Sequence, residues 1–192
     1  TKKNNLKRLF DIFTSIILIF FLFLPSILII FLIKIVNKNS AIYISRRLGK
    51  NKKIFKMYKF RTMHPNTPEV GSNSLKNAEI HITKFGKILR KYSLDELPQL
   101  INVLKGEMSL VGPRPNLPIQ IELIRERDKY NLYRFQPGIT GLSQINKIDM
   151  SNPELLAESD NKMMINFNQI AYLKYLFRTV IGKGNGDAME MK

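Results

Sequence analysis

A long apolar run near the N-terminus constrains this chain more than any other feature. From Ile12 to Ile33 the sequence reads IFTSIILIFFLFLPSILIIFLI, which is 22 residues without a charged side chain. A helix needs about 20 apolar residues to cross a bilayer, so this run is long enough to do so. It is too long for the apolar part of a signal peptide, and no small-residue cleavage site follows it. We therefore expect a membrane segment here.

The charges and the proline around this run do not suit a simple spanning helix. Such a helix carries Lys and Arg mainly on its cytoplasmic side. Here basic residues stand on both sides: Lys2, Lys3, Lys7 and Arg8 before the run, and Lys34, Lys38, Arg46, Arg47, Lys50, Lys52 and Lys53 after it. Pro25 lies near the middle, next to Ser26, and its missing backbone donor favours a kink. Each limb of about 13 residues then reaches roughly 20 Å, which is less than the hydrocarbon thickness of about 30 Å.

Two interpretations of the run follow from these properties. In the first, a re-entrant helix that bends at Pro25 and Ser26 enters one leaflet and returns, so both basic flanks stay on the cytoplasmic face. In the second, an ordinary helix spans the bilayer, and neighbouring groups satisfy the backbone that the proline frees. The residues alone leave both interpretations open.

The rest of the composition narrows the chemistry that the chain can perform. With 31 Lys and Arg against 15 Asp and Glu, the formal net charge of +16 indicates a polyanionic partner. Charge alone does not distinguish nucleic acid, anionic lipid and phosphorylated substrate. The absence of Cys excludes disulfides, thiolate nucleophiles and Cys-based zinc sites. The two histidines, His64 and His81, lie in separate polar stretches, which argues against a histidine metal cluster.

Beyond the membrane segment we expect one mixed α/β domain that is predominantly helical. Alternating apolar and basic residues predict a small β-hairpin of residues 41–45 and 53–63, joined by a turn at Leu48–Lys52. Residues 64–79, which are rich in Pro, Gly and Asn, predict a loop. The sequence GKGNGD at 182–187 predicts a flexible tail rather than a phosphate-binding loop.

Periodic apolar positions predict several helices in the second half of the chain. One carries Leu97, Leu100, Ile101 and Leu104 on one face and ends at Lys105-Gly106. Further helices are expected over residues 119–133 and from residue 153 onward. Near the end, QIAYLKYLFRTVI suits an interfacial helix, and ordinary core packing explains it nearly as well.

The stretch SLDELPQL, Ser93 to Leu100, places two adjacent carboxylates in a chain that is poor in acid. Ser93 followed by Glu96 is typical of a capping box at a helix start, with Asp95 near the positive end of the helix dipole. Pro98 conflicts with this, because in the fifth helical position it would remove a hydrogen bond and crowd the preceding turn. We therefore expect an irregular turn, and a helix cap and a catalytic pair stay open as alternatives.

Three longer motifs carry a family resemblance: KFRTM at 59–63, KFGKILRKYSLDELPQLINVLKGEMSLVGPRP at 84–115 and RFQPGITGLSQIN at 134–146. In order and spacing they resemble the bacterial sugar transferases that initiate glycan assembly on polyprenyl phosphate, the monotopic phosphoglycosyl transferases. The resemblance extends from KRLFD at 7–11 to the region of Asp160, which is nearly the whole chain. The long central block is far more specific than a short motif.

The resemblance implies a reaction and a cellular location. A sugar 1-phosphate passes from a UDP-sugar to undecaprenyl phosphate, UMP is released, and Mg²⁺ is the cofactor. The family's membrane segment is a re-entrant helix broken at proline, which favours that interpretation for residues 1–36. Residues 37–192 would then form a catalytic domain on the cytoplasmic face of the inner membrane, with interfacial amphipathic helices around the active site on the phospholipid bilayer.

Carried over by position, the resemblance makes Asp95 the nucleophile that forms a covalent phosphosugar intermediate, and Glu96 a catalytic metal ligand. Side chains of neighbouring helical residues point about 100° apart, so the two carboxylates can take different tasks. Cations are needed because a carboxylate that attacks phosphorus meets anionic oxygens. The candidates for substrate binding are Lys59, Arg61, Arg90, Pro113, Arg114, Pro115 and Asp160.

Several positions depart from the family's pattern, both at the helix break and after the motifs. Leu24 stands before the proline in place of Ser, Ser45 in place of Gln, Lys147-Ile148 in place of Gly-Arg, and Lys162-Met163 in place of tyrosines. Donor recognition is therefore expected to differ, and the sequence does not name the sugar.

Two other functions stand as alternatives. A basic monotopic protein that binds anionic lipid, or scaffolds a glycan-assembly complex, would use the two carboxylates only as a helix cap. Nucleic-acid binding rests on the basic charge alone, because the sequence has no helix-turn-helix, RNP or zinc pattern, and it would leave the membrane segment unexplained. We therefore expect no nucleic-acid partner.

Overall fold

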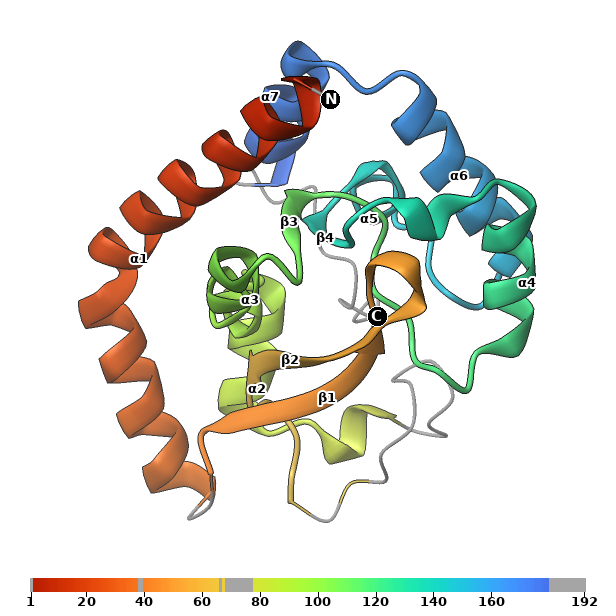
Figure 1. The fold of residues 1–192 in the computed structure, drawn as a ribbon. Coiled ribbons are helices and arrows are strands. Elements are labelled where there is room, and N and C mark those ends of the chain that lie inside the picture. Colours follow the sequence, from red (N-terminus) through yellow and green to blue (C-terminus); the bar gives the residue numbers. More distant parts are fainter. Residues whose placement is uncertain (1, 38–39, 66, 68–77, 180–192) are drawn as a thin grey trace.

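The computed structural model describes residues 2–37, 40–65, 67 and 78–179. A long helix lies along one side of a mainly helical body that contains two small sheets (Figure 1). The α-helices are α1 (Lys2–Asn37), α2 (Lys84–Lys91), α3 (Gln99–Lys105), α4 (Ile121–Lys129), α5 (Leu142–Ile145), α6 (Pro153–Ile165) and α7 (Gln169–Arg178). The strands are β1 (Ile42–Leu48), β2 (Ile54–Phe60), β3 (Ser109–Val111) and β4 (Gly138–Thr140). Short 3₁₀ turns are η1 (Lys50–Lys52), η3 (Ala78–His81), η4 (Leu94–Glu96) and η5 (Leu132–Arg134).

Helix α1 contains the apolar run and continues through Pro25 without an interruption. It follows a curved path around the body, so the structure shows a curved helix rather than two helices separated at the proline (Figure 1). Its outward side is strongly apolar, with Phe20 76% and Leu24 75% exposed. Within the described residues, α1 is the helix long and apolar enough to cross a membrane. Pro25 itself is exposed, and Ser26 is half-buried.

The N-terminal part of α1 is attached to the body through Asp11, a buried carboxylate. It accepts hydrogen bonds from the Ser109 hydroxyl at 2.8 Å, the Leu110 backbone N–H at 3.0 Å and the Tyr172 hydroxyl at 2.8 Å. Burial and the neighbouring carboxylate raise the pKa of the Tyr172 phenol, which therefore stays protonated and donates. One side chain of α1 thus connects the membrane helix to β3 and α7.

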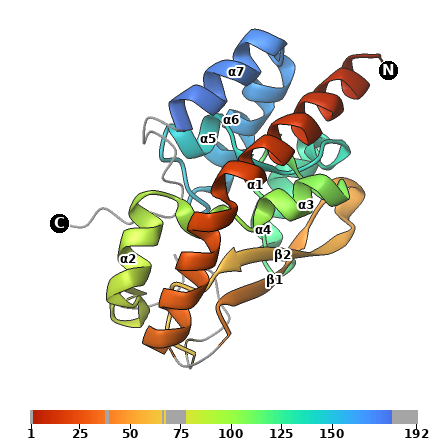
Figure 2. The same ribbon diagram turned by 90° about the vertical axis from the view of Figure 1, so that its left-hand side faces the viewer.

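The C-terminal part of α1 contacts the same body through apolar side chains. Ile29 and Ile33 are buried in a cluster with Ala41, Phe60 and Leu89, which come from the start of the hairpin, β2 and α2. Figure 2, turned by 90°, shows α1 running across this side of the body, with α7 towards its N-terminal part and α2 towards its C-terminal part. Both ends of the apolar helix are therefore packed on one folded unit.

The predicted β-hairpin is confirmed. Strands β1 and β2 pair antiparallel from Ile42 opposite Phe60 to Leu48 opposite Ile54. The first strand ends at Leu48, three residues beyond its predicted end, because η1 turns the chain tightly, with Asn51 at a φ of 54°. On β2, Phe55 and Met57 point into the core while Ile54 is exposed, as the alternation predicts.

A second, two-stranded parallel sheet brings the VGPRP and QPGITG segments together. Strands β3 and β4 pair with Ser109 opposite Gly138 and Val111 opposite Thr140. The approach is so close that a Cβ on Gly138 would lie 2.0 Å from the Gly112 nitrogen. Only glycine fits at this crossing, and the crossing fixes where the chain leaves β3 toward Arg114.

The remaining predicted helices form with different bounds. The helix expected from residue 153 onward is divided into α6 and α7, and the short helix α5 was not predicted. Gly106, at a φ of 82°, ends α3 as predicted. The helix expected over residues 119–133 is shorter, because α4 stops at Lys129 and η5 follows after Asn131 at a φ of 51°. Most of the predicted loop at 64–79 and all of the predicted tail at 182–187 lie outside the described residues.

We expect Tyr172→Phe to destabilise the fold, because it removes a donor from the buried Asp11 carboxylate. A hydrogen bond to a charged group contributes about 1.5–3 kcal/mol, so the free energy of unfolding should fall by that amount. Tyr175→Phe on the same helix is the matched control, since the Tyr175 hydroxyl has no hydrogen-bond partner in the described part of the chain. Thermal unfolding in detergent would measure both variants. Equal losses would contradict a special contribution from the Asp11 contact.

Candidate active site

The two acidic residues lie in an irregular turn between α2 and α3. Ser93 adopts the left-handed conformation at a φ of 53° and makes no side-chain cap, so the predicted capping box is wrong. The chain instead forms the short turn η4 and starts a second helix, α3, directly after Pro98. Proline is well tolerated at a helix start, because its missing N–H has no helical partner there. The expectation of an irregular turn is thus confirmed. Its cause differs, because Pro98 does not disturb the interior of a helix but stands at the start of a new one.

The carboxylates of this turn meet two basic side chains from other parts of the chain. Glu96 Oε1 lies 3.0 Å from Lys59 Nζ and 3.0 Å from Arg114 Nη2. Lys59 Nζ also lies 4.0 Å from Asp95 Oδ2, and Asp95 is 4% exposed. Two acids and two bases therefore share a mostly buried cluster, in which ion pairs are stronger than at the surface. We call Lys59, Asp95, Glu96 and Arg114 the acid–base cluster.

Three separate elements supply this cluster. Lys59 belongs to β2, the carboxylates to η4, and Arg114 to the loop that follows β3. The backbone around Arg114 is held on both sides: the carbonyl of Pro113 accepts from Gly138 N–H at 2.9 Å, and that of Pro115 from Arg47 Nη1 at 3.4 Å. The two prolines thus frame Arg114, and both are buried.

Arg90, on α2, is a further cation next to this turn. Its Nε donates to the Thr62 hydroxyl at 3.0 Å, while its buried Nη1 has no hydrogen-bond partner among the residues that the structure describes. Gly86 permits this arrangement, because a Cβ there would lie 2.1 Å from the Thr62 carbonyl oxygen. A buried guanidinium donor without a partner is uncommon in folded proteins and points to an external acceptor, for which an anionic oxygen is well suited.

Two other candidates lie apart from the acid–base cluster. Arg61 donates from Nε to the Ser40 carbonyl at 2.9 Å and stacks over the Tyr43 ring, so it closes the open end of the hairpin. Asp160, on α6, is completely buried, and its Oδ2 lies 2.6 Å from Arg127 Nη2. The geometry of Asp160 favours a positioning role over direct contact with substrate.

Arg127 is a residue that the sequence analysis missed. It is 2% exposed on α4, and its Nη1 donates to the Arg114 carbonyl at 2.8 Å and to Asn116 Oδ1 at 3.1 Å. Asp160 also accepts from the Ser143 hydroxyl at 2.6 Å. Burial raises the pKa of the Asp160 carboxyl, and the Arg127 guanidinium and this hydroxyl oppose that rise. Asp160 and Arg127 thus hold the loop that carries Arg114.

A signal for Arg127 exists in its charged segment, RERDK at 125–129, although a run of charges usually forms a solvated helix face. Leu123 is four residues earlier, and both side chains are buried on one side of α4. A basic residue four positions after a core leucine is therefore the available clue.

The carboxylates of the cluster could hold Mg²⁺ only together with phosphate oxygens supplied by a substrate. In the part of the chain that the structure describes, no group of three or more acidic or histidine side chains gathers to hold a metal. Mg²⁺ is often bound by one or two carboxylates together with substrate phosphates, and Asp95 and Glu96 match that smaller requirement. Glu96 would be the ligand, because Asp95 is reserved for attack on phosphorus in the predicted scheme.

Comparison of the sequence with known proteins places this chain among bacterial sugar transferases. The family described as bacterial sugar transferase matches residues 2–183. The chain is 40% identical over 178 residues to "Uncharacterized sugar transferase EpsL" of Bacillus subtilis, covering 91% of this chain and 85% of that protein. It is 37% identical over 192 residues to "Exopolysaccharide production protein ExoY" of Rhizobium meliloti, covering 91% and 83%. It is 43% identical over 157 residues to "Undecaprenyl-phosphate galactose phosphotransferase" of Salmonella typhimurium, covering 73% of this chain and 32% of that protein.

We expect Asp160→Asn to destabilise the protein strongly, because it leaves the buried Arg127 charge without its partner. Breaking a buried ion pair on one side costs about 3–5 kcal/mol. Asp128→Asn is the matched control, since its ion pair with Lys52 is nearly half exposed and contributes below about 1 kcal/mol. Chemical unfolding would measure both losses. Unchanged stability of Asp160→Asn with weakened donor binding would show direct substrate contact instead.

Proposed function

Because this chain belongs to the bacterial sugar transferase family, we propose that it transfers a sugar 1-phosphate from a UDP-sugar to undecaprenyl phosphate. The family match covers nearly all of the chain, and a relative of 43% identity carries the acceptor and the phosphotransfer in its name. The observation that carries the proposal is the mostly buried acid–base cluster, in which two adjacent carboxylates face two cations.

In the proposed reaction, an Asp95 carboxylate oxygen attacks the phosphorus that bears the sugar. A bond forms between this oxygen and phosphorus, the bond from phosphorus to the bridging oxygen breaks, and UMP leaves with the electron pair. A phosphate oxygen of undecaprenyl phosphate then attacks the same phosphorus and releases the Asp95 carboxylate. Two displacements at phosphorus thus divide one difficult transfer into two easier steps.

The cations around Asp95 support this step, because they offset the repulsion between a carboxylate and phosphate oxygens. Lys59 lies within 4.0 Å of Asp95, and Glu96 holds both Lys59 and Arg114 in place through one oxygen. Arg90 offers a phosphate oxygen its Nη1 donor, which has no partner within the described part of the chain. Mg²⁺, when bound through Glu96 and the donor phosphates, would supply further charge neutralisation.

We place the enzyme on the cytoplasmic face of the inner membrane, with α1 as a re-entrant helix. A spanning helix has its ends on opposite sides of a bilayer, whereas both ends of α1 pack on one body. That body exposes charged groups such as Lys52 and Asp128, and it therefore suits an aqueous environment rather than the hydrocarbon core.

Two further helices present apolar side chains that suit contact with the bilayer surface. On α3 these side chains are Ile101 and Leu104, which are 48% and 37% exposed. On α7 they are Ile170, Leu173 and Phe177, which are 80%, 59% and 66% exposed. An exposed apolar helix face is typical of an interfacial helix. This arrangement holds the acid–base cluster at the level of the lipid phosphates. The phosphate group of the acceptor, undecaprenyl phosphate, lies at the same level.

We expect Asp95→Asn to abolish UMP release from the true UDP-sugar donor, because an amide is a very weak nucleophile. The rate with membranes and Mg²⁺ should fall by at least about a thousandfold, which is the scale of losing a catalytic nucleophile. Asp128→Asn, an exposed carboxylate outside the cluster, should retain activity. Equal release by wild type and Asp95→Asn would contradict the nucleophile. No release by either, over a broad donor panel, would favour the non-catalytic scaffold.

The re-entrant helix predicts that both flanks of α1 can be labelled from the same side. Because the chain has no Cys, Lys3→Cys and Ser40→Cys each provide a single reactive thiol. Both should react with an impermeant thiol reagent only when the cytoplasmic face is accessible, and Leu24→Cys should be protected by lipid. Reaction of the two flanks from opposite sides would show that the helix spans the bilayer.

A further inference from the structure

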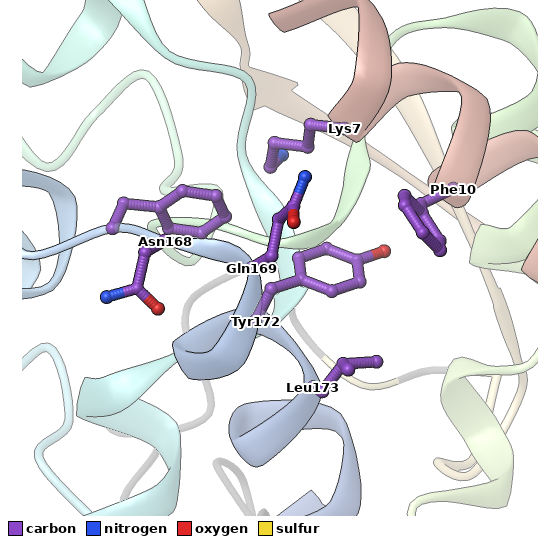
Figure 3. Close-up of a pocket in the computed structure, with 7 residues that line it drawn as sticks. Lys7, Phe10, Asn168, Gln169, Tyr172 and Leu173 are labelled. Atoms are coloured by element: carbon purple, nitrogen blue, oxygen red, sulfur yellow. The ribbon is translucent and has the colours of Figure 1, made fainter. Parts of the chain in front are cut away.

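Two adjoining pockets lie beside the N-terminal part of α1 and form no part of the acid–base cluster. The first has a volume of about 370 Å³, within the roughly 300–1,000 Å³ typical of ligand sites. It is lined by Lys7, Phe10, Phe167, Asn168, Gln169, Tyr172 and Leu173. Figure 3 shows Phe10 from α1 facing Tyr172 and Leu173 from α7 across this space, while the Asn168 amide points away from it. The pocket is therefore largely apolar.

The second pocket is smaller and basic. Its volume is about 240 Å³, and Lys7, Arg8, Lys50 and Arg134 are among its lining residues. It shares Lys7 and Phe167 with the first pocket, so an apolar space adjoins a positively charged one. The pair of pockets is therefore complementary to an amphiphile that has an apolar tail and an anionic head.

The charge of the second pocket is available to a ligand. Its one acidic lining residue, Asp11, is buried and already accepts from Ser109, Leu110 and Tyr172. Lys50 and Arg134 are exposed and form no ion pair with an acid in the described part of the chain. These two side chains therefore carry net positive charge that the fold does not neutralise.

The position of the pockets matches the boundary of a bilayer. The uncharged run starts at Ile12, directly after the segment KRLFD at 7–11, which contains Lys7, Arg8 and Phe10. Phe10 is 44% and Leu173 59% exposed, so the apolar pocket opens on the same surface that suits contact with lipid. Basic pockets at the cytoplasmic surface are suited to anionic lipid headgroups.

We propose that this pair of pockets binds one anionic phospholipid. An acyl chain occupies the apolar pocket between Phe10 and Leu173, and Lys50 and Arg134 hold the headgroup phosphate. The Asp11 contacts of α1 form the floor between the two pockets, so the bound lipid steadies the attachment of α1 and α7. No residue of the acid–base cluster lines either pocket, and the lipid takes no part in the reaction.

The test is a competition between two lipids, read by native mass spectrometry of the full chain in detergent. With equal phosphatidylglycerol and phosphatidylcholine, wild type should retain one phosphatidylglycerol in roughly fivefold preference, because each nearby Lys or Arg favours an anionic headgroup. Lys50→Gln with Arg134→Gln should reduce the preference to about one. Lys53→Gln with Lys84→Gln removes two exposed charges outside the pockets and should leave the preference unchanged.

A second pair of variants tests the apolar pocket. Leu173→Trp fills it and should abolish the retained lipid, whereas Ile170→Trp, at a residue of the same helix that lines neither pocket, should not. Thermal unfolding of each variant separates lost binding from lost fold. Equal retention of both lipids, the same effect from both charge pairs, or displacement of phosphatidylglycerol by undecaprenyl phosphate at lower concentration would overturn the proposal.

Discussion

The buried carboxylate of Asp11 is the contact on which the architecture depends. It lies almost a hundred residues from Ser109 in sequence and joins a membrane helix to the strand from which the Arg114 loop leaves. An unpaired carboxylate at this depth would be very costly, so its donors must be in place whenever the helix is docked. Helix α1 is therefore a structural part of the catalytic body and more than an anchor attached to it.

From this attachment the site is built in two further steps. The glycine crossing of β3 and β4 sets the path of the chain toward Arg114, and the Arg127–Asp160 pair holds that segment from the other side. These two contacts place Arg114 where it pairs with Glu96, which lies in the irregular turn before Pro98. The positions of the four charged groups thus follow from contacts outside the cluster.

Local sequence signals predict much of this fold, and tertiary contacts decide the rest. The alternation of apolar and basic residues over 54–60 predicts the hairpin. Gly106 predicts the end of α3, and Pro98 predicts an irregular turn. The capping box fails because Ser93 takes a left-handed conformation and its side chain does not cap the turn. The sequence itself draws attention to the carboxylate pair, but the catalytic roles of Asp95 and Glu96 follow from the family resemblance. The buried partners of Asp11 and Asp160 could not be predicted from the sequence, because no periodicity encodes a contact between distant segments.

The central claim is that Asp95 carries a temporary bond to phosphorus, and mass spectrometry of the trapped enzyme tests it most directly. Incubation with the UDP-sugar donor alone, rapid quenching and tryptic digestion should yield the peptide Tyr92–Lys105 with the added mass of the sugar phosphate. Its only acids are Asp95 and Glu96, and fragmentation should place the mass on Asp95. An adduct on any other residue, or none while UMP release continues, would contradict the account.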